Sequence, residues 1–314
     1  MAETTTTTTK AASNRRGNSR LSLYWRRFVR NRPAVAGLVI LILLVLFACF
    51  GNRFNPCRVL NPMGGGDMIR CTHSDIDFLA LSQAPSGNHL FGTNSTGLDV
   101  YAIVTHGLQR SLVIAIVVSF VTVLIAAFLG GLAAYLGGKG EKLILGIVNF
   151  LLIMPAFLMM AIVASTTGGN WIWLIVVLII FGWFVEARVI WQLSTSIRER
   201  DFVSAARQMG VPGWKVVFRH IVPNIGSLLV INFVLGVVST VMQETALSYL
   251  GFGIKVPDVS LGSALVDGQA AIYTTPWAFI YPVAALSLLT ISFGLMADGL
   301  RDALDPNSAA GGKA

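Results

Sequence analysis

Charged residues are scarce in this sequence. Asp, Glu, Lys and Arg make up only 12% of the 314 residues, whereas hydrophobic residues make up 54% and the mean hydropathy is +0.71. A typical soluble protein has about 25% charged residues. The composition therefore excludes an ordinary soluble globular protein. It predicts a protein embedded in lipid, because the apolar runs are spread along the whole chain.

Signatures of catalysis are also missing. Residues 137–140 form a Gly-rich stretch with Lys139, but it lacks the first glycine and the Ser/Thr after the lysine that a Walker A loop needs. The four histidines lie outside any H-E-x-x-H pattern, and no serine lies in G-x-S-x-G. We therefore expect no enzyme and no catalytic residue here, and any ATP hydrolysis must take place on another chain.

Long apolar segments are what the sequence does contain. A bilayer core of about 30 Å needs about 20 apolar helical residues, and helices are required because backbone polar groups in lipid must be paired within their own segment. One such segment could be a buried helix of a soluble protein, but six could not. The expected spans are residues 34–50, 111–136, 143–163 with Pro155 inside, 171 to about 191, 225–242 and 277–296.

Basic residues are distributed unevenly between the segments that join these spans. Eighteen of the 23 Lys and Arg residues lie in the N-terminal segment, after the second span, around the region between the fourth and fifth spans, and in the tail. The positive-inside rule then places both termini in the cytoplasm of an inner (cytoplasmic) membrane. The same distribution explains the net charge of +8 without nucleic acid, because no basic patch is interleaved with aromatic residues.

These patterns divide the chain into regions. No cleavable signal peptide is expected, because the first apolar run begins only at residue 34. Residues 21–32 can form a basic amphipathic helix on the lipid surface, with Trp25 and Phe28 as anchors. The expected regions are a basic, partly disordered segment at 1–33, a first transmembrane helix at 34–50, an extracytoplasmic loop at 51–110, a core of five transmembrane helices at 111–300 that includes a cytoplasmic loop at 198–223, and a cytoplasmic tail at 301–314.

The three cysteines have different expected roles. Cys49 lies in the first span and is interpreted as a small buried apolar residue. Cys57 and Cys71 lie in the extracytoplasmic loop, where an oxidising compartment favours a disulfide between them. Two free thiols in a Gly/Pro-rich loop are the alternative. No metal site is expected, because these two cysteines and the nearby His73 lack a fourth zinc ligand.

The segment before the fifth span predicts a helical hairpin. Asp201 can cap a short helix, Gly210 can end it, and Pro212 and Gly213 can turn the chain into a second helix before Pro223 opens the span. An apolar helix face on a cytoplasmic surface is covered either by a partner or by the protein's own helix ends. The apolar residues at helical spacing are Phe202, Ala205, Ala206 and Met209.

This hairpin resembles the EAA loop of bacterial ABC importer permeases. That pattern has Glu-Ala-Ala, a glycine four residues later and a proline thirteen residues further on, and Ala205, Ala206, Gly210 and Pro223 fall on these positions. Ser204 stands where the pattern has glutamate. The resemblance implies coupling to an ATPase subunit through Asp201, Phe202, Ala205, Ala206, Met209, Gly210, Pro212 and Gly213.

Two further stretches are similar to the dipeptide/oligopeptide/nickel permease family. Residues 89–112 resemble its H-x-x-G-T-D-x-x-G-R-D segment, although Asn94 and Leu98 depart from the Asp and Arg of that pattern. Residues 244–253 and 298–306 look like the second half of the family's C-type permease. The resemblance extends over about residues 25–306.

The resemblance implies an all-α polytopic membrane protein with six transmembrane helices and the type I ABC importer permease fold. Its partners would be a second homologous permease, two nucleotide-binding ATPase subunits or domains that use ATP and Mg, an extracytoplasmic substrate-binding protein and membrane lipid. Di- or oligopeptides are the expected substrate, and nickel, haem, an antimicrobial peptide or another small solute is the alternative. An ion-coupled carrier is the rival class. The implied translocation path includes Asn149, Pro155, Asn232 and Glu244.

Overall fold

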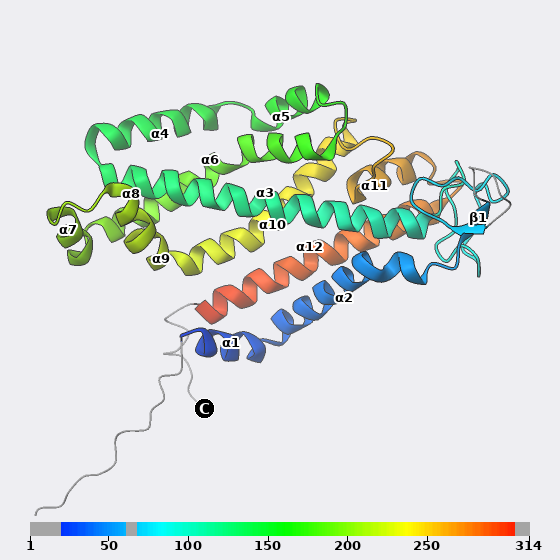
Figure 1. The fold of residues 1–314 in the computed structure, drawn as a ribbon, viewed down its shortest axis with the longest axis horizontal. Helices are drawn as coiled ribbons and strands as arrows, with labels where there is room; N and C mark the ends of the chain where they lie inside the picture. The colour runs from blue at the N-terminus through cyan, green and yellow to red at the C-terminus, as the bar shows by residue number, and fades with distance from the viewer. Residues whose placement is uncertain (1–19, 61–67, 305–314) are drawn as a thin grey trace, which may run out of the picture.

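The protein is a bundle of helices that run along one long axis (Figure 1). The computed structural model describes residues 20–60 and 68–304, so most of the expected N-terminal segment and tail lies outside the described residues. The helices are α1 (Arg20–Arg30), α2 (Arg32–Phe54), α3 (Val100–Leu136), α4 (Gly138–Ile153), α5 (Ala156–Ser165), α6 (Trp171–Arg198), α7 (Asp201–Gln208), α8 (Gly213–Val216), the π-helical turn η1 (Val217–Ile221), α9 (Val222–Asn224), α10 (Gly226–Tyr249), α11 (Leu261–Ala270) and α12 (Pro276–Leu304). Strands β1 (Arg58–Leu60) and β2 (Met68–Arg70) form a small antiparallel hairpin.

Five of the described helices are long and apolar enough to cross a membrane, namely α2, α3, α6, α10 and α12. The pair α4 and α5 is a sixth candidate, but its two helices are bent by 76°. The bend lies at Pro155, which lacks a backbone N–H and pushes Met154 out of the helical region to an extended conformation (φ −69°, ψ 139°). The predicted membrane class is confirmed, and the break lies at Pro155, the residue expected to interrupt the third span.

The helices are longer than the uncharged segments that predicted them. The second span was expected to begin at residue 111, but α3 begins at Val100, so residues 100–110 are helical. The reason is that an uncharged run indicates only the part of a helix that can cross the bilayer core. The helix itself extends about three turns further toward the N-terminus, to Val100. Its polar side chains there are paired, since His106 and Arg110 both contact Asp258.

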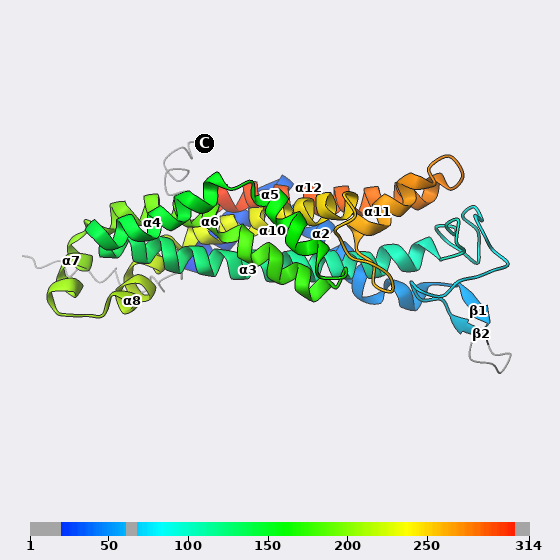
Figure 2. The same ribbon diagram turned by 90° about the horizontal axis from the view of Figure 1, so that it is seen from above.

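Close helix contacts depend on small residues, because lipid tails provide no hydrophobic drive for two helices to associate. α3 lies in the middle of the bundle and packs most extensively against α6 (Figures 1 and 2). A Cβ on Gly130 of α3 would lie 2.6 Å from the carbonyl oxygen of Ala187 in α6. A Cβ on Gly37 of α2 would lie 2.7 Å from the carbonyl oxygen of Ser292 in α12. Glycine therefore sets the spacing of both helix pairs.

The N-terminal helix α1 packs against the bundle through one of its two predicted anchors. Phe28 is buried with Ala34 and Ala303, so it contacts α2 and α12 rather than lipid. Trp25 is 60% exposed and stacks beside Phe28, with ring centroids 6.0 Å apart. Of the two predicted anchors, Trp25 is therefore the one that can contact a lipid surface.

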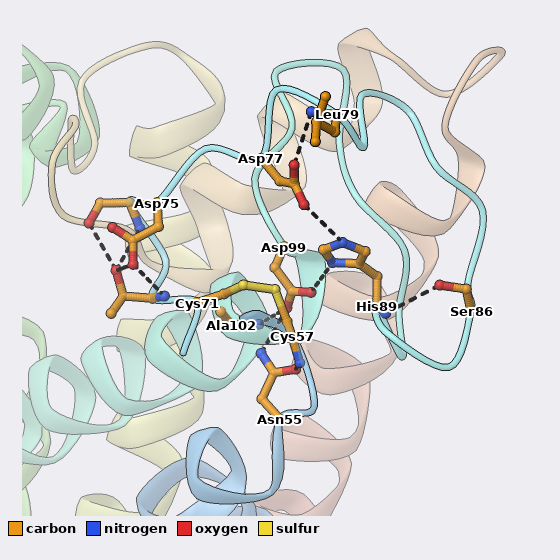
Figure 3. Close-up of a disulfide and its surroundings, with 12 residues drawn as sticks. Asn55, Cys57, Cys71, Asp75, Asp77, Leu79, Ser86, His89, Asp99 and Ala102 are labelled. Atoms are coloured by element: carbon orange, nitrogen blue, oxygen red, sulfur yellow. Dashed lines mark hydrogen bonds and ion pairs between the residues drawn. A yellow bond between two sulfur atoms is a disulfide. The ribbon is translucent and has the colours of Figure 1, made fainter. Parts of the chain in front are cut away.

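Residues 55–60 and 68–99, here called the disulfide loop, lie at one end of the bundle (Figure 1), and Figure 3 shows the surroundings of the disulfide. Cys57 and Cys71 are joined by a disulfide, with their Cα atoms 5.5 Å apart, at the base of the β1–β2 hairpin. Asp99 ends the loop as the N-cap of α3 and is 1% exposed. Cys49 is an exposed free thiol on α2, so the expectation that it is buried is wrong.

Candidate functional site

The predicted hairpin forms the end of the bundle opposite the disulfide loop (Figure 1). Helix α7 ends in a Schellman motif: the N–H of Val211 donates to the carbonyl of Ala206 at 3.2 Å, and the N–H of Gly210 donates to the carbonyl of Arg207 at 3.1 Å. Gly210 has a φ of +73°, a conformation that L side chains rarely adopt. The predicted stop at Gly210 is therefore confirmed.

The start of α7 differs from the expected one. Arg200 is the N-cap residue, with no capping hydrogen bond from its side chain, and Asp201 is the first helical residue. The prediction that Asp201 caps the helix is wrong. Its carboxylate still lies at the positive end of the helix dipole, where a negative charge is stabilising by a few tenths of a kcal/mol.

The apolar residues of α7 divide into two faces. Ala206 is 2% exposed and packs, with Val203, into the same core as Val216 and Ile221 of the following turns. It is therefore covered by the chain itself, which corrects the expectation of a single stripe presented to a partner. The residues of that stripe that remain exposed are Phe202, Ala205 and Met209, the last at 75%.

The turn after α7 docks tightly onto the end of α3. A Cβ on Gly213 would lie 2.5 Å from the ring of Tyr135, so only glycine allows this approach. Pro212 is the N-cap residue of α8, which confirms the predicted turn. Pro223, however, lies in the short helix α9, and α10 begins at Gly226.

An apolar groove continues from this turn, and the sequence reasoning missed it. Trp214 and Phe218 are 55% and 50% exposed. Their spacing of four residues, which places two side chains on one helix face, was the available signal. The groove has a volume of about 650 Å³ and is lined by Val211, Trp214, Lys215, Phe218, Arg219 and His220.

The four residues proposed for a translocation path lie on α4, at the break between α4 and α5, and on α10. Asn149 is exposed on α4 and accepts a hydrogen bond from the Arg188 guanidinium of α6. Pro155 is exposed at the break between α4 and α5, and Asn232 is half-buried on α10. These three lie on different elements, so their common role stays a prediction.

Glu244 lies in the interior of the chain, at 1% exposure. Its Oε1 accepts hydrogen bonds from Ser248 at 2.8 Å and from Ser260 at 2.6 Å. Ser260 is also the N-cap of α11. Glu244 therefore ties α10 to the start of α11, and its assignment to a path surface is corrected.

The matched family covers more than half of the chain. Residues 123–309 match the family described as "Binding-protein-dependent transport system inner membrane component". The chain belongs to this family. Residues 19–60 also match the "N-terminal TM domain of oligopeptide transport permease C", which corresponds to α1, α2 and β1. It is therefore a multi-pass membrane permease subunit, as the hairpin pattern predicted.

Curated relatives of this permease match about nine-tenths of its length. "Oligopeptide transport system permease protein OppC" of Mycobacterium tuberculosis (strain ATCC 25618 / H37Rv) is 40% identical over 292 residues, which cover 92% of this chain and 96% of the relative. The protein with that description from Haemophilus influenzae is 34% identical over 284 residues, 90% of this chain and 86% of the relative. "Dipeptide transport system permease protein DppC" of Lactococcus lactis is 28% identical, over 91% and 90% of the two chains.

A second polar cluster of the permease lies at the disulfide-loop end. Asp258, in the loop between α10 and α11, accepts hydrogen bonds from His106 at 2.7 Å and from Arg110 at 2.9 Å, both on α3. Burial alone would raise the pKa of Asp258, but these two bonds and the Val259 N–H lower it below its usual value. Burial and the neighbouring His106 lower the pKa of His73. The carboxylate is thus charged and the His73 imidazole is neutral near pH 7.

Proposed function

We propose that this permease is one membrane subunit of an ATP-driven importer of di- or oligopeptides. The observation that carries the proposal is the hairpin with its exposed apolar residues and adjoining groove at one end of a helical bundle. The proposed peptide substrate rests on similarity, over about nine-tenths of the chain, to permeases described as oligopeptide or dipeptide transport proteins. Nickel, haem and other small solutes are the alternatives that the substrate test below distinguishes.

The hairpin is the part of the chain that suits a coupling element. Phe202, Ala205 and Met209 project from α7, and the groove beside Trp214 and Phe218 extends the same apolar surface. In the proposed assembly a nucleotide-binding subunit covers this surface, and a second such subunit covers the related permease. ATP with Mg binds those subunits, and their closure shifts the permease pair between two global states because ATP binds one state better.

The proposed path runs between this chain and the second permease, along the broken pair α4–α5 and α10. Asn149, Pro155 and Asn232 are polar or irregular positions on these elements that are not fully buried. Their exposure fits contact with a second chain or with substrate. An extracytoplasmic binding protein would deliver peptide at the disulfide-loop end.

The proposed orientation places the hairpin and both termini in the cytoplasm of the cytoplasmic membrane, because the basic residues are concentrated at the hairpin end. Leu90→Cys and Lys215→Cys, each in a Cys49→Ala background, test it. Leu90 is 41% exposed in the disulfide loop, so a membrane-impermeant maleimide is expected to label that variant in intact cells. The Lys215 variant is expected to react only after permeabilisation. Labelling of Lys215→Cys in intact cells would reverse the orientation.

Reconstitution tests the proposed function. The permease, expressed with its second permease and ATPase subunits, is purified and inserted into liposomes with its binding protein. Peptide bound to the binding protein is expected to raise ATP hydrolysis at least tenfold, and peptide is expected to accumulate only when ATP is present. Stimulation by nickel or haem but not by peptide would change the substrate. Peptide uptake driven by an ion gradient, with no ATPase bound, would favour the carrier instead.

A further inference from the structure

Three side chains from remote parts of the chain meet at the disulfide-loop end. His73 comes from the disulfide loop, His106 from the second turn of α3, and Asp258 from the loop between α10 and α11. One nitrogen or oxygen atom from each lies within 4.8 Å of the other two. The side chains of His106 and Asp258 are 21% and 18% exposed, so the cluster is partly open to solvent.

The hydrogen bonds define which ring nitrogens carry protons. The imidazole rings of His73 and His106 stack with centroids 3.6 Å apart and an interplanar angle of 7°. His73 Nε2 lies 3.1 Å from the carbonyl oxygen of Pro257, which can only accept, so Nε2 is the donor. In the tautomer that carries its proton on Nε2, Nδ1 is the ring nitrogen with the free lone pair. His106 Nε2 donates in the same way to the carboxylate of Asp258.

We propose that His73, His106 and Asp258 bind one divalent transition-metal cation of the zinc class. Two imidazoles and one carboxylate suit such borderline ions, and water would complete a four-coordinate site. On binding, the cation takes the place of the proton between His106 Nε2 and Asp258 Oδ1, and that proton moves to Nδ1 of His106 or to solvent. A carbonyl bond such as that from His73 to Pro257 is the usual means of orienting a metal-bound imidazole.

The site must rearrange to hold the ion. A metal bonds an imidazole nitrogen in the plane of the ring, and two nearly parallel planes 3.6 Å apart cannot meet at one ion, so the His106 ring must turn out of its stack with His73 while the bond from His73 to Pro257 stays. Metal–ligand distances of about 2.0–2.2 Å place tetrahedral ligands roughly 3.4 Å apart. The distance of 2.7 Å between His106 Nε2 and Asp258 Oδ1 must therefore open slightly. Arg110 contacts the same carboxylate oxygen at 2.9 Å and opposes a cation there. Its guanidinium also lies 4.4 Å from the Trp171 ring, a contact that remains available when the ion is bound.

Ions can reach the cluster from two sides. A cavity of about 400 Å³ is lined by His73 and Pro257, and a second, of about 410 Å³, is lined by Lys255 and Asp258. A bound cation would join the disulfide loop, α3 and residues 251–260 into one unit. A second group, Cys57 with His89 and Asp99, has similar spacing but is buried, and its sulfur is used by the disulfide.

Metal titration tests the proposal. The full-length chain is purified in detergent through a histidine-free tag and without reductant, then titrated with Zn²⁺ against a chelating dye. We expect one Zn²⁺ per chain at micromolar concentration, with affinity at least tenfold lower in His73→Ala, His106→Ala and Asp258→Asn. Zn²⁺ is expected to raise the melting temperature of the unaltered chain and not of these variants.

Two controls make the outcome decisive. His220→Ala removes a histidine at the opposite end of the bundle and is expected to bind Zn²⁺ normally. His73→Gln replaces the alanine variant if that one fails to fold, since the Gln amide can still donate to the Pro257 carbonyl; it is likewise expected to bind at least tenfold more weakly. Failure of the unaltered chain to bind Zn²⁺, or unchanged affinity in folded His73 and His106 variants, would overturn the proposal. Neither result bears on ATP-driven uptake.

Discussion

Ala205→Asp is expected to abolish peptide-stimulated ATP hydrolysis while leaving the permease folded. Ala205 is exposed on α7, between Phe202 and Met209, on the surface that we propose an ATPase subunit covers. An aspartate there would be closed into the interface without a partner charge, which costs several kcal/mol. Because about 1.4 kcal/mol corresponds to a tenfold change in affinity, co-purification of the ATPase subunit and peptide uptake should both fall by well over tenfold.

The neighbouring substitution Ala206→Asp is expected to act differently. Ala206 is 2% exposed, in the core that Val216 and Ile221 share. A carboxylate buried there has no partner, so the hairpin itself should open at a cost of several kcal/mol. The melting temperature of the isolated permease is expected to fall for Ala206→Asp and to stay unchanged for Ala205→Asp. The melting temperature therefore separates a defect in the interface from a defect in folding.

Ser204→Glu provides the matched control for charge. It adds a carboxylate one position before Ala205, at an exposed site where the family pattern has glutamate. ATPase binding and uptake are expected to be retained. If Ala205→Asp supports normal uptake and ATPase binding, the exposed face of α7 is not the coupling surface. Equal loss in Ser204→Glu and Ala205→Asp would point to net charge rather than to this face.

Asp99→Ala is expected to have the largest effect on stability in the disulfide loop. Asp99 Oδ1 accepts the N–H of Ala102 at 2.8 Å and the side-chain amide of Asn55 at 3.1 Å. Its Oδ2 accepts the Nδ1–H of His89 at 2.8 Å, as Figure 3 shows. Removing the N-cap costs about 1 kcal/mol, and each buried donor left without an acceptor costs about 1–3 kcal/mol. We expect a total loss of roughly 3–7 kcal/mol, measured as a lower melting temperature in detergent.

Asp75→Ala is the control for this prediction. Asp75 lies in the same loop and accepts from the N–H and hydroxyl of Thr72, both at 2.8 Å, but these bonds are exposed. The loss is expected to stay below about 1 kcal/mol, as for most surface substitutions. Asp99→Asn keeps one acceptor oxygen and should fall between the two alanine variants. Equal melting temperatures for Asp99→Ala and Asp75→Ala would show that the buried network contributes little.

Several features of this permease could be predicted because they follow from local requirements. A span is recognisable from the sequence because lipid requires a long uncharged run with all backbone groups paired inside it. The end of α7 could be predicted because a residue with a positive φ favours glycine, and Gly210 follows an apolar helical segment. The pattern of Ala205, Ala206, Gly210 and Pro223 then indicated the family that the comparison established.

Other features depend on contacts between segments far apart in the sequence, so local pattern could not decide them. Helical spacing placed Ala205 and Ala206 in one apolar stripe, but only the packing of α8 and η1 covers Ala206 and leaves Ala205 exposed. Glu244 stood near the end of a span, but only Ser260, sixteen residues later, turns it into a buried link to α11.

By itself, then, the sequence determined the membrane class, the approximate spans and the position of the hairpin, because each rests on the chemistry of neighbouring residues. The tertiary structure decided which face of α7 is free, how sharply the third span bends at Pro155, and that His73, His106 and Asp258 meet. The last two of these residues are 152 positions apart in the chain. Side chains so distant become neighbours only when the helices that carry them pack together, and periodicity within one helix carries no information about that packing.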